Sequence, residues 1–194
     1  MAPPGSDVAP MRRLRATRST VRTATPPRAI ARPTKLSFVQ LRVLSPDDWE
    51  LWRGTRLRAL ADSPRAFGAT LAEWQSADRD RWRQRLSAVP FNVVAVVRDE
   101  TVGQASGTQL DGEQRVELIS MWVAPSARGY GVADALVAAV REYAEQAGAS
   151  AVRLSVRRDN ERAIGMYARA GFVLADEPAD EPAEISMLCP LRHA

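Results

Sequence analysis

The stretch of sequence that decides the fold is Val-Ala-Pro-Ser-Ala-Arg-Gly-Tyr-Gly-Val-Ala, residues 123–133. It follows an apolar run at 115–123 that is typical of a strand, and it leads into residues 131–147, whose apolar side chains recur at helical spacing. Gly129 and Gly131 allow the backbone to approach a ligand closely. Backbone N–H groups at a helix N-terminus attract anions. The sequence therefore predicts a strand, an anion-binding loop that suits a diphosphate, and a long helix.

A second pattern follows at residues 160–172, Asn-Glu-Arg-Ala-Ile-Gly-Met-Tyr-Ala-Arg-Ala-Gly-Phe. Asn160 is a preferred N-cap residue, and Gly171 suits the end of a short helix. The flanking segments have the composition of strands, at 151–156, 172–175 and 185–191. Because the helix at 131–147 joins the strands at 115–123 and 151–156, we expect a parallel crossover between these two strands.

The two patterns together resemble the signatures of a known family. Residues 128–133 fit Q/R-x-x-G-x-G/A, and residues 160–172 fit N-x-x-A-x-x-x-Y-x-x-x-G-F, in the same order as in the GNAT N-acetyltransferase superfamily. The resemblance extends over nearly all of 36–194. It implies an α+β fold of the GNAT type, with a mixed, mostly antiparallel sheet, a central parallel strand pair and helices on both faces.

The resemblance also implies a cofactor site and no metal. Acetyl-CoA would be the co-substrate, its diphosphate held by the loop and its pantetheine arm paired with the preceding strand like an added strand. Arg128 would add charge beside the diphosphate, although a solvated loop arginine explains it too. Asn160 would contact the cofactor, although helix capping alone accounts for it. The implied cofactor-binding residues are Met121, Val123, Arg128, Gly129, Tyr130, Gly131, Val132, Ala133 and Asn160.

Two residues are candidates for proton transfer in the implied acetylation. Tyr167 would protonate the departing thiolate, since a thiol pKa of about 8.5 lies near a phenol pKa of about 10. The alternative for Tyr167 is core packing. Glu117 would accept the proton of the attacking amine, because positions 117, 119, 121 and 123 share one face of a regular strand. The alternative for Glu117 is a strand-surface glutamate. Direct transfer within a ternary complex would depend on holding the amine and the thioester in line.

The first half of the chain supplies the remaining elements. Residues 36–44 alternate like a half-buried strand, and Ser45-Pro46 opens a helix that runs to about Asp62. We expect the apolar stripe of this helix to contain Trp49, Trp52, Leu57 and Leu60. A second helix is expected over 71–87, followed by strands at 91–98 and 101–110 that are joined by an Asp99-Glu100 turn. The predicted order is β-α-α-β-β-β-α-β-α-β-β.

Rare residues exclude several kinds of site. The 194 residues contain one cysteine, Cys189, and one histidine, His193, and Lys35 is the only lysine. These counts exclude intrachain disulfides, cysteine-based zinc sites and Ser-His-Asp catalysis, and they suit a cytoplasmic setting. A Walker-type loop needs a lysine that 36–194 lacks. A Rossmann site needs G-x-G-x-x-G, but position 134 is Asp, although Asp159 is placed tolerably for a ribose contact.

The basic character of the chain belongs to its N-terminal segment. Residues 1–35 hold eight basic residues, one acid and six of the 13 prolines, while residues 36–194 hold 19 basic and 22 acidic residues. The segment lacks aromatic residues and any hydrophobic period, so we expect a disordered basic tail before a domain at 36–194. No apolar run is long enough for a membrane span. Without aromatic residues for base stacking, the tail makes nucleic acid an unlikely partner.

The acceptor expected from the resemblance is an amine on a small molecule or a peptide. Residues 176–184, Asp-Glu-Pro-Ala-Asp-Glu-Pro-Ala-Glu, carry five carboxylates and no base. At a cleft mouth they would favour a cationic acceptor, although an acidic, proline-rich loop is most often only a solvated connection. The resemblance also implies a possible homodimer. Two alternatives remain open: an acyl-CoA-binding protein without turnover, and a binder of nucleic acid or acidic surfaces that acts through the tail.

Overall fold

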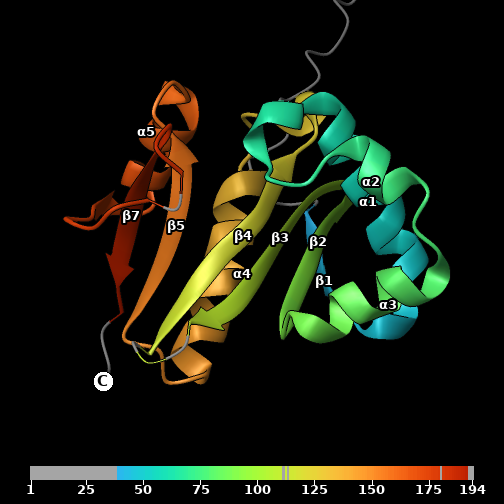
Figure 1. The fold of residues 1–194 in the computed structure, drawn as a ribbon, viewed down its shortest axis with the longest axis horizontal. Coiled ribbons are helices and arrows are strands. Elements are labelled where there is room, and N and C mark those ends of the chain that lie inside the picture. Colours follow the sequence, from blue (N-terminus) through green and yellow to red (C-terminus); the bar gives the residue numbers. More distant parts are fainter. Residues whose placement is uncertain (1–38, 111, 113, 180, 192–194) are drawn as a thin grey trace, which may run out of the picture. The chain divides into compact units, whose positions relative to one another are not determined.

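The computed structural model describes residues 39–191 except 111, 113 and 180 (Figure 1). The predicted tail at 1–35 lies outside the described residues. The described residues form one seven-stranded sheet in the order β1-β2-β3-β4-β5-β7-β6. Its strands are β1 (Gln40–Val43), β2 (Phe91–Val97), β3 (Glu100–Leu110), β4 (Arg115–Val123), β5 (Ala151–Arg157), β6 (Val173–Leu174) and β7 (Glu184–Pro190). All neighbouring strands are antiparallel except β4 and β5, so the predicted fold class and the parallel crossover are confirmed.

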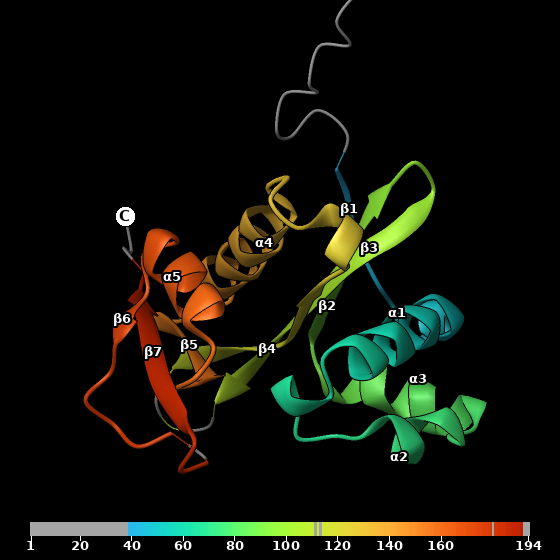
Figure 2. The same ribbon diagram turned by 90° about the horizontal axis from the view of Figure 1, so that it is seen from above.

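Helices cover both faces of the sheet (Figure 2). Three helices of the first half lie on one face, and the two later helices lie on the other, where Arg141 of α4 donates to the Ala170 carbonyl at the end of α5 over 3.3 Å. The α-helices are α1 (Trp49–Asp62), α2 (Leu71–Gln75), α3 (Arg79–Ala88), α4 (Val132–Gln146) and α5 (Glu161–Arg169). Short 3-10 helices occupy Pro46–Asp48 (η1), Pro64–Ala66 (η2) and Pro125–Ala127 (η3).

The two faces bury separate apolar clusters. Trp52 of α1 and Trp82 of α3 are fully buried against Val94 of β2. On the other face, α4 packs its apolar stripe on the central strands, with Leu136 and Val140 fully buried. Burial of such side chains stabilises a fold by about 1.5–3 kcal/mol each. Helices therefore pack on both faces of the sheet, and this packing fixes the positions of the central strands that carry the site.

Three predicted details of the first half differ in the structure. The helix expected over 71–87 is two helices, because the Asp78 side chain accepts a hydrogen bond from the Arg81 N–H over 2.9 Å and starts α3 anew. The turn between β2 and β3 is Arg98-Asp99, one residue earlier than predicted, with both residues at positive φ. The strand expected to be half-buried, β1, is exposed throughout, because it forms an edge of the sheet.

The strand pair at the centre of the sheet separates along its length. β4 and β5 pair only at Arg115, Val116 and Glu117, and beyond these residues the two strands diverge (Figure 1). A β-bulge in β4 accompanies the separation, since Ile119 pairs with Ser106 whereas Trp122 pairs with Gln104. The bulge contains Ser120, whose φ of +58° is in the left-handed region.

The bulge corrects the expectation that residues 117, 119, 121 and 123 share one face. Directly opposed residues of an antiparallel pair lie on the same face. Ser106 and Gln104 share a face, so their partners Ile119 and Trp122 also share one although three positions separate them. The alternation shifts by one residue, and Val123, opposite Gly103, lies on the other face from Glu117.

We predict that Gly103→Ala destabilises the fold by about 1–3 kcal/mol through overpacking. A Cβ at Gly103 would lie 2.9 Å from Leu136 Cδ1 and 3.0 Å from the Trp122 carbonyl oxygen, so the α4 side chains and the neighbouring β4 backbone must give way. Gly54→Ala is the matched control, because nothing lies within 4 Å of a Cβ there and alanine favours the interior of α1 by about 0.5–1 kcal/mol. Urea unfolding at pH 7 measures both, and equal free energies for the two variants would contradict the close approach of α4.

Candidate functional site

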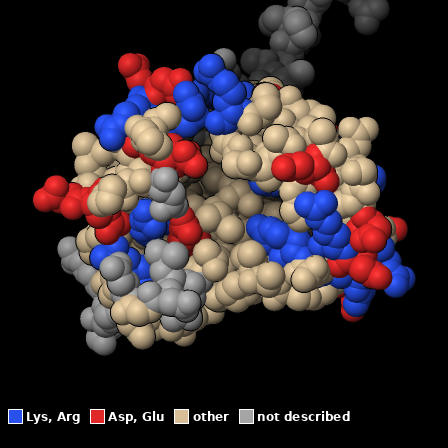
Figure 3. Space-filling model, viewed as in Figure 1, with Lys and Arg blue, Asp and Glu red and all other residues tan. Residues whose placement is uncertain are grey.

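A cleft of about 800 Å³ opens where β4 and β5 diverge. Figure 3 shows the corresponding hollow in this face of the molecule, with basic atoms on its edge toward α1–α3. The two separated strands, the segment after α1, the loop before α4 and the helix α5 all contribute to its walls. Six arginines and three acidic residues line the cleft, so it is a predominantly basic site.

The loop predicted to bind an anion closes one end of this cleft. Gly129 and Gly131 both line the cleft and have positive φ values of 85° and 83°. Gly131 caps α4, and by helix geometry the first N–H groups of α4 have no partner within the helix. A Cβ at Gly129 would have nothing within 4 Å, so the space in front of the loop is open to a ligand. The local geometry fits an anion cradle.

The other loop residues contribute in different ways. Ala133 lines the cleft, whereas Val132 is 1% exposed and packs in the core, so only its backbone can serve a ligand. Tyr130 is 56% exposed and is not among the residues that line the cleft. Met121 and Val123 line it from β4, but the Val123 carbonyl already accepts a hydrogen bond from Arg128 Nε over 3.0 Å. The structure therefore brings most of the predicted cofactor-binding residues to one cleft.

Arg128 lines the cleft, but its side chain is held by contacts within the protein. Besides its bond to Val123, its guanidinium forms an ion pair with Asp62 at the end of α1. Asp62 also accepts a hydrogen bond from the Trp122 indole over 2.9 Å. Asp62 thus joins α1, β4 and the loop before α4, and Arg128 holds the loop in position.

The environment of Asp62 favours its charged form. Burial alone would raise the pKa of the carboxyl, but the hydrogen bonds from Trp122 and Ser63 and the charge of Arg128 outweigh burial and lower the pKa below its usual value. The carboxylate therefore stays ionised at neutral pH and keeps both of its partners.

The two α5 residues predicted to act also reach the cleft. Tyr167 is 7% exposed and lines the cleft, with its ring edge-to-face against Phe172 at a centroid distance of 5.7 Å. Burial raises the pKa of Tyr167 well above that of a free phenol, so the hydroxyl keeps its proton. Asn160 lines the cleft too, and its side chain accepts a hydrogen bond from the Ala163 N–H over 3.2 Å, as an N-cap does.

Glu117 lines the cleft at the last paired position of β4 and β5. It lies on the face of the sheet that α1 and α3 cover, because its partner Thr108 shares a face with Ser106, which bonds to Asn92 beneath α3. Glu117 and Tyr167 thus reach the same cleft from the sheet and from α5.

Two arginines of the cleft were missed by the sequence analysis. Arg56 of α1 and Arg85 of α3 line the wall opposite α5. A signal for both was present, since Arg56 stands four residues from Trp52 and Arg85 three residues from Trp82, on the apolar faces of their helices. An arginine within an apolar stripe is a candidate for a buried role.

The acidic loop does not support the expected cationic acceptor. Of the described residues in 176–184, only Glu184 lines the cleft. Glu177 instead forms ion pairs with Arg115 at 2.8 Å and Arg153 at 3.0 Å and accepts from Ser186 Oγ over 3.2 Å. Glu177 is thus held by side chains of β4, β5 and β7, and Glu184 is the one described carboxylate of this segment that adds negative charge to the cleft.

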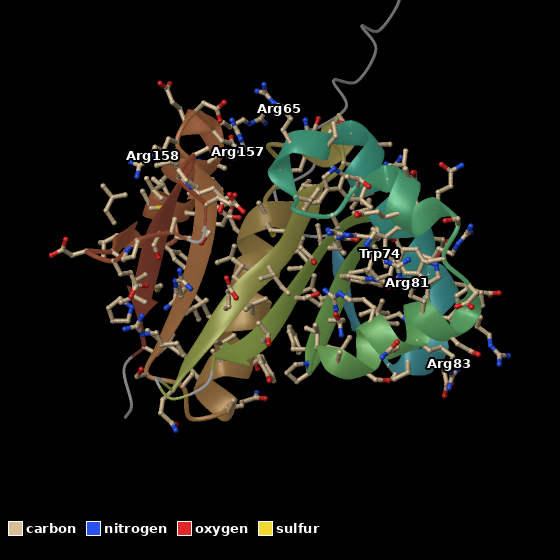
Figure 4. The ribbon with its side chains drawn as sticks, viewed as in Figure 1. Arg65, Trp74, Arg81, Arg83, Arg157 and Arg158 are labelled. Carbon is tan, nitrogen blue, oxygen red and sulfur yellow. The ribbon has the colours of Figure 1, made fainter. Side chains whose placement is uncertain are left out.

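An ion-pair cluster links the two sides of the cleft at one rim. Asp159, in the turn before α5, lies 2.8 Å from Arg157 and 3.5 Å from Arg65 of η2. Figure 4 shows Arg65 of η2 and Arg157 at the end of β5 near each other at this rim. All three side chains are partly exposed, so the ion pairs contribute little stability, but they join η2 to the turn before α5.

Neither a metal site nor a membrane span is found in the described part of the chain. Its histidine, cysteine and acidic residues form no group of three that could hold a metal ion. Among the same residues, the helices are too short or too polar to cross a bilayer.

Comparison with known proteins gives a family match and similar structures. The model of the acetyltransferase (GNAT) family matches residues 55–172. A mycothiol acetyltransferase of Renibacterium salmoninarum is 29% identical over 157 residues, covering 76% of this chain and 44% of that protein. The chain spans less than half the length of the mycothiol acetyltransferases that it matches.

Two solved structures share the fold. The PaiA N-acetyltransferase of Thermoplasma acidophilum, in complex with coenzyme A, has a TM-score of 0.64 at 14% identity, covering 79% of this chain and 99% of that chain. The yncA acetyltransferase of Salmonella typhimurium, solved with acetyl-CoA, has a TM-score of 0.63 at 17% identity, covering 81% and 96%.

We predict that Asp62→Asn lowers the free energy of unfolding by about 1–2 kcal/mol at pH 7, because two donors lose a charged acceptor. The pKa of Asp62 is lower in the folded chain than its unfolded value of about 3.9, so its contribution is present above about pH 4 and is lost as pH falls through the folded pKa. Urea unfolding between pH 7 and pH 2.5 should show the two proteins converging in acid. Asp176→Asn, at an exposed position, is the control, and a constant difference across this range would disprove the role of the Asp62 charge.

Proposed function

The chain belongs to the GNAT family of acetyltransferases, and from this premise we propose that it transfers an acetyl group from acetyl-CoA to a primary amine. The observation that carries the proposal is the cleft between β4 and β5, which has the glycine loop of α4 at one end and Glu117 and Tyr167 in its walls. The acetyl group would pass directly to the amine within a ternary complex. A homodimer, a cytoplasmic location and a domain at 36–194 behind a basic tail stay predictions.

The residues of the cleft fit acetyl-CoA. The first N–H groups of α4 and the left-handed glycines suit a diphosphate, and among the described residues no strand pairs with the edge of β4 beyond Glu117 on the side of β5. An extended amide-containing arm can satisfy such an edge as an added strand does. Relatives in fold were solved with coenzyme A and acetyl-CoA, which supports the same ligand here.

Acetyl-CoA would supply an activated thioester, and the chain would supply position and protons. Glu117 is the proposed base for the amine, directly or through water. Tyr167 is the proposed acid for the leaving thiolate, because burial keeps its hydroxyl protonated until the thiolate forms; the same raised pKa makes it a weaker acid than a free phenol. Arg128, through Asp62, is a positioning residue for the loop. Holding the reactants in line supplies much of the rate in such a transfer.

One experiment separates this function from its two alternatives. Calorimetry of the full chain with acetyl-CoA tests binding, and release of free thiol with a panel of amines then tests turnover. Binding with turnover supports the proposed enzyme. Binding without turnover for every amine supports an acyl-CoA-binding protein, and the absence of binding would leave the basic tail as the functional segment.

We predict that Gly131→Asp weakens acetyl-CoA binding by about an order of magnitude or more, because it places bulk and negative charge in the cradle. Gly148→Asp is the matched control, since Gly148 follows the other end of α4 with a φ of +75° and so carries the same backbone strain. Calorimetry gives the dissociation constants, and thermal unfolding confirms that both variants fold. An unchanged affinity in folded Gly131→Asp would refute the cradle.

We predict that Tyr167→Phe lowers kcat by about 10²–10⁴-fold with little change in KM for acetyl-CoA, since a general acid acts mainly in the transition state. Tyr143→Phe is the control, because that ring stacks on Phe91 at 4.7 Å and does not line the cleft. Steady-state thiol release measures both variants. A loss of less than about threefold for Tyr167→Phe would return this residue to a packing role.

A further inference from the structure

Two arginine side chains enter the cleft from the helices of the first half. Arg56 comes from α1 and Arg85 from α3, and both line the cleft. Neither forms an ion pair with any described residue, whereas many of the other arginines of the chain do. The Nη1 nitrogen of Arg56 is buried and has no hydrogen-bond partner among the described residues.

The surroundings of both guanidinium groups are unfavourable for charge. Burial, together with the nearby charge of Arg85, lowers the pKa of Arg56 to about 10. Burial lowers the pKa of Arg85 to about 10 as well. Two like charges without a counter-ion in a partly buried place destabilise a fold unless an anion compensates them.

Aromatic rings and neutral oxygens hold the two groups in place without neutralising them. The Arg56 guanidinium lies 4.3 Å from the centre of the Phe67 ring, and that of Arg85 lies 5.4 Å from the Trp52 ring. Arg85 also donates to Asn92 Oδ1 over 3.3 Å and to Ser120 Oγ over 3.2 Å. These contacts fix the orientation of the guanidinium planes and leave the charge available to a ligand.

The position of the pair separates it from the diphosphate cradle. The cradle follows the end of β4, whereas Arg85 contacts Ser120 in the bulge, where β4 has already left β5. The charged group of the loop, Arg128, is engaged with Asp62 on another side of the cleft. Arg56 and Arg85 therefore lie in the wall of the cleft that α1 and α3 form, beside the middle of β4.

We propose that Arg56 and Arg85 bind a carboxylate of the acceptor, so that the substrate class is a small amine that carries a carboxylate a few bonds from its amino group. The inference rests on the proposed function. Guanidinium groups match a carboxylate with paired, charge-assisted hydrogen bonds, and two of them can hold both of its oxygens. The arrangement replaces the cationic acceptor expected from the acidic loop by a zwitterionic one.

A binding experiment tests the pair without turnover. N-acetylglycine is the smallest product with this carboxylate, and N-acetylglycinamide is its neutral match; both are titrated into the full chain in the presence of CoA. We expect the acid to bind at least about tenfold more tightly than the amide, a difference of about 1.4 kcal/mol. Arg56→Gln and Arg85→Gln should remove that difference. Equal binding of the two probes to the unsubstituted chain, or no binding of either, would overturn the proposal.

Matched variants test whether the preference for the acid depends on Arg56 and Arg85. Arg83→Gln removes an arginine from the same helix as Arg85, but Arg83 pairs with Asp47 at 2.6 Å and points away from the cleft (Figure 4). It should keep the preference for the acid. Arg85→Lys retains the positive charge and should keep part of the preference for the acid. This variant tests the proposal if Arg85→Gln folds poorly. Affinity for acetyl-CoA should change by less than about threefold in every variant, and a tenfold loss would assign the pair to the cofactor instead.

Turnover distinguishes failure of this inference from failure of the proposed function. Amino acids are compared with the amines that lack their carboxylate, such as phenylalanine with phenethylamine and glycine with methylamine. A preference for the acids in kcat/KM that disappears in Arg56→Gln supports the proposal. Acetylation of amines without that preference would overturn the inference and retain the proposed function. Tight binding of N-acetylglycine without any acetylation would contradict the proposed function and retain the carboxylate site.

Discussion

The separation of β4 from β5 is the constraint on which the site depends. Backbone N–H and C=O groups inside a protein need partners, and two strands that part in the middle of a sheet leave such groups facing each other across a gap. The bulge at Ser120 holds the strands apart, and its left-handed backbone is kept in place by Gln104, which donates to the Ser120 carbonyl over 3.0 Å, and by Arg85. The main chain thus opens the cleft, and the side chains that line it set its charge.

The parts that could be predicted from sequence are those set by local backbone demands. Gly129, Gly131 and Gly171 have positive φ values, and Asn160 caps its helix, so each residue type follows from its own conformation. The succession of strands and helices along the chain followed from hydrophobic periodicity, and the parallel pair followed from the helix that joins its two strands. The separated strands, the loop and α5 then came together as the motif order indicated.

The features that escaped prediction depend on contacts between distant segments. No glycine or proline marks the bulge at Ser120, whose conformation is supported by side chains from β3 and α3. Without the bulge, simple alternation placed Val123 on the wrong face. The spacing of Arg56 and Arg85 from buried tryptophans was a signal, but only the packed structure shows that their guanidinium groups are largely buried and form no ion pair with a described acidic residue. The acidic loop had a conspicuous composition, yet Glu177 is held by Arg115 and Arg153.

The aromatic lining of the cleft has an optical consequence. Four of the five tryptophans of the chain, Trp52, Trp74, Trp82 and Trp122, line the cleft, and Trp74 and Trp82 are in contact at a ring-centroid distance of 4.5 Å. Indole emission depends on the polarity and the charges around the ring. A ligand that displaces water from this cleft therefore alters the surroundings of Trp74 and Trp122, which solvent reaches, and with them the intrinsic fluorescence of the chain. Tryptophan fluorescence can therefore report ligand binding in the cleft without an attached dye.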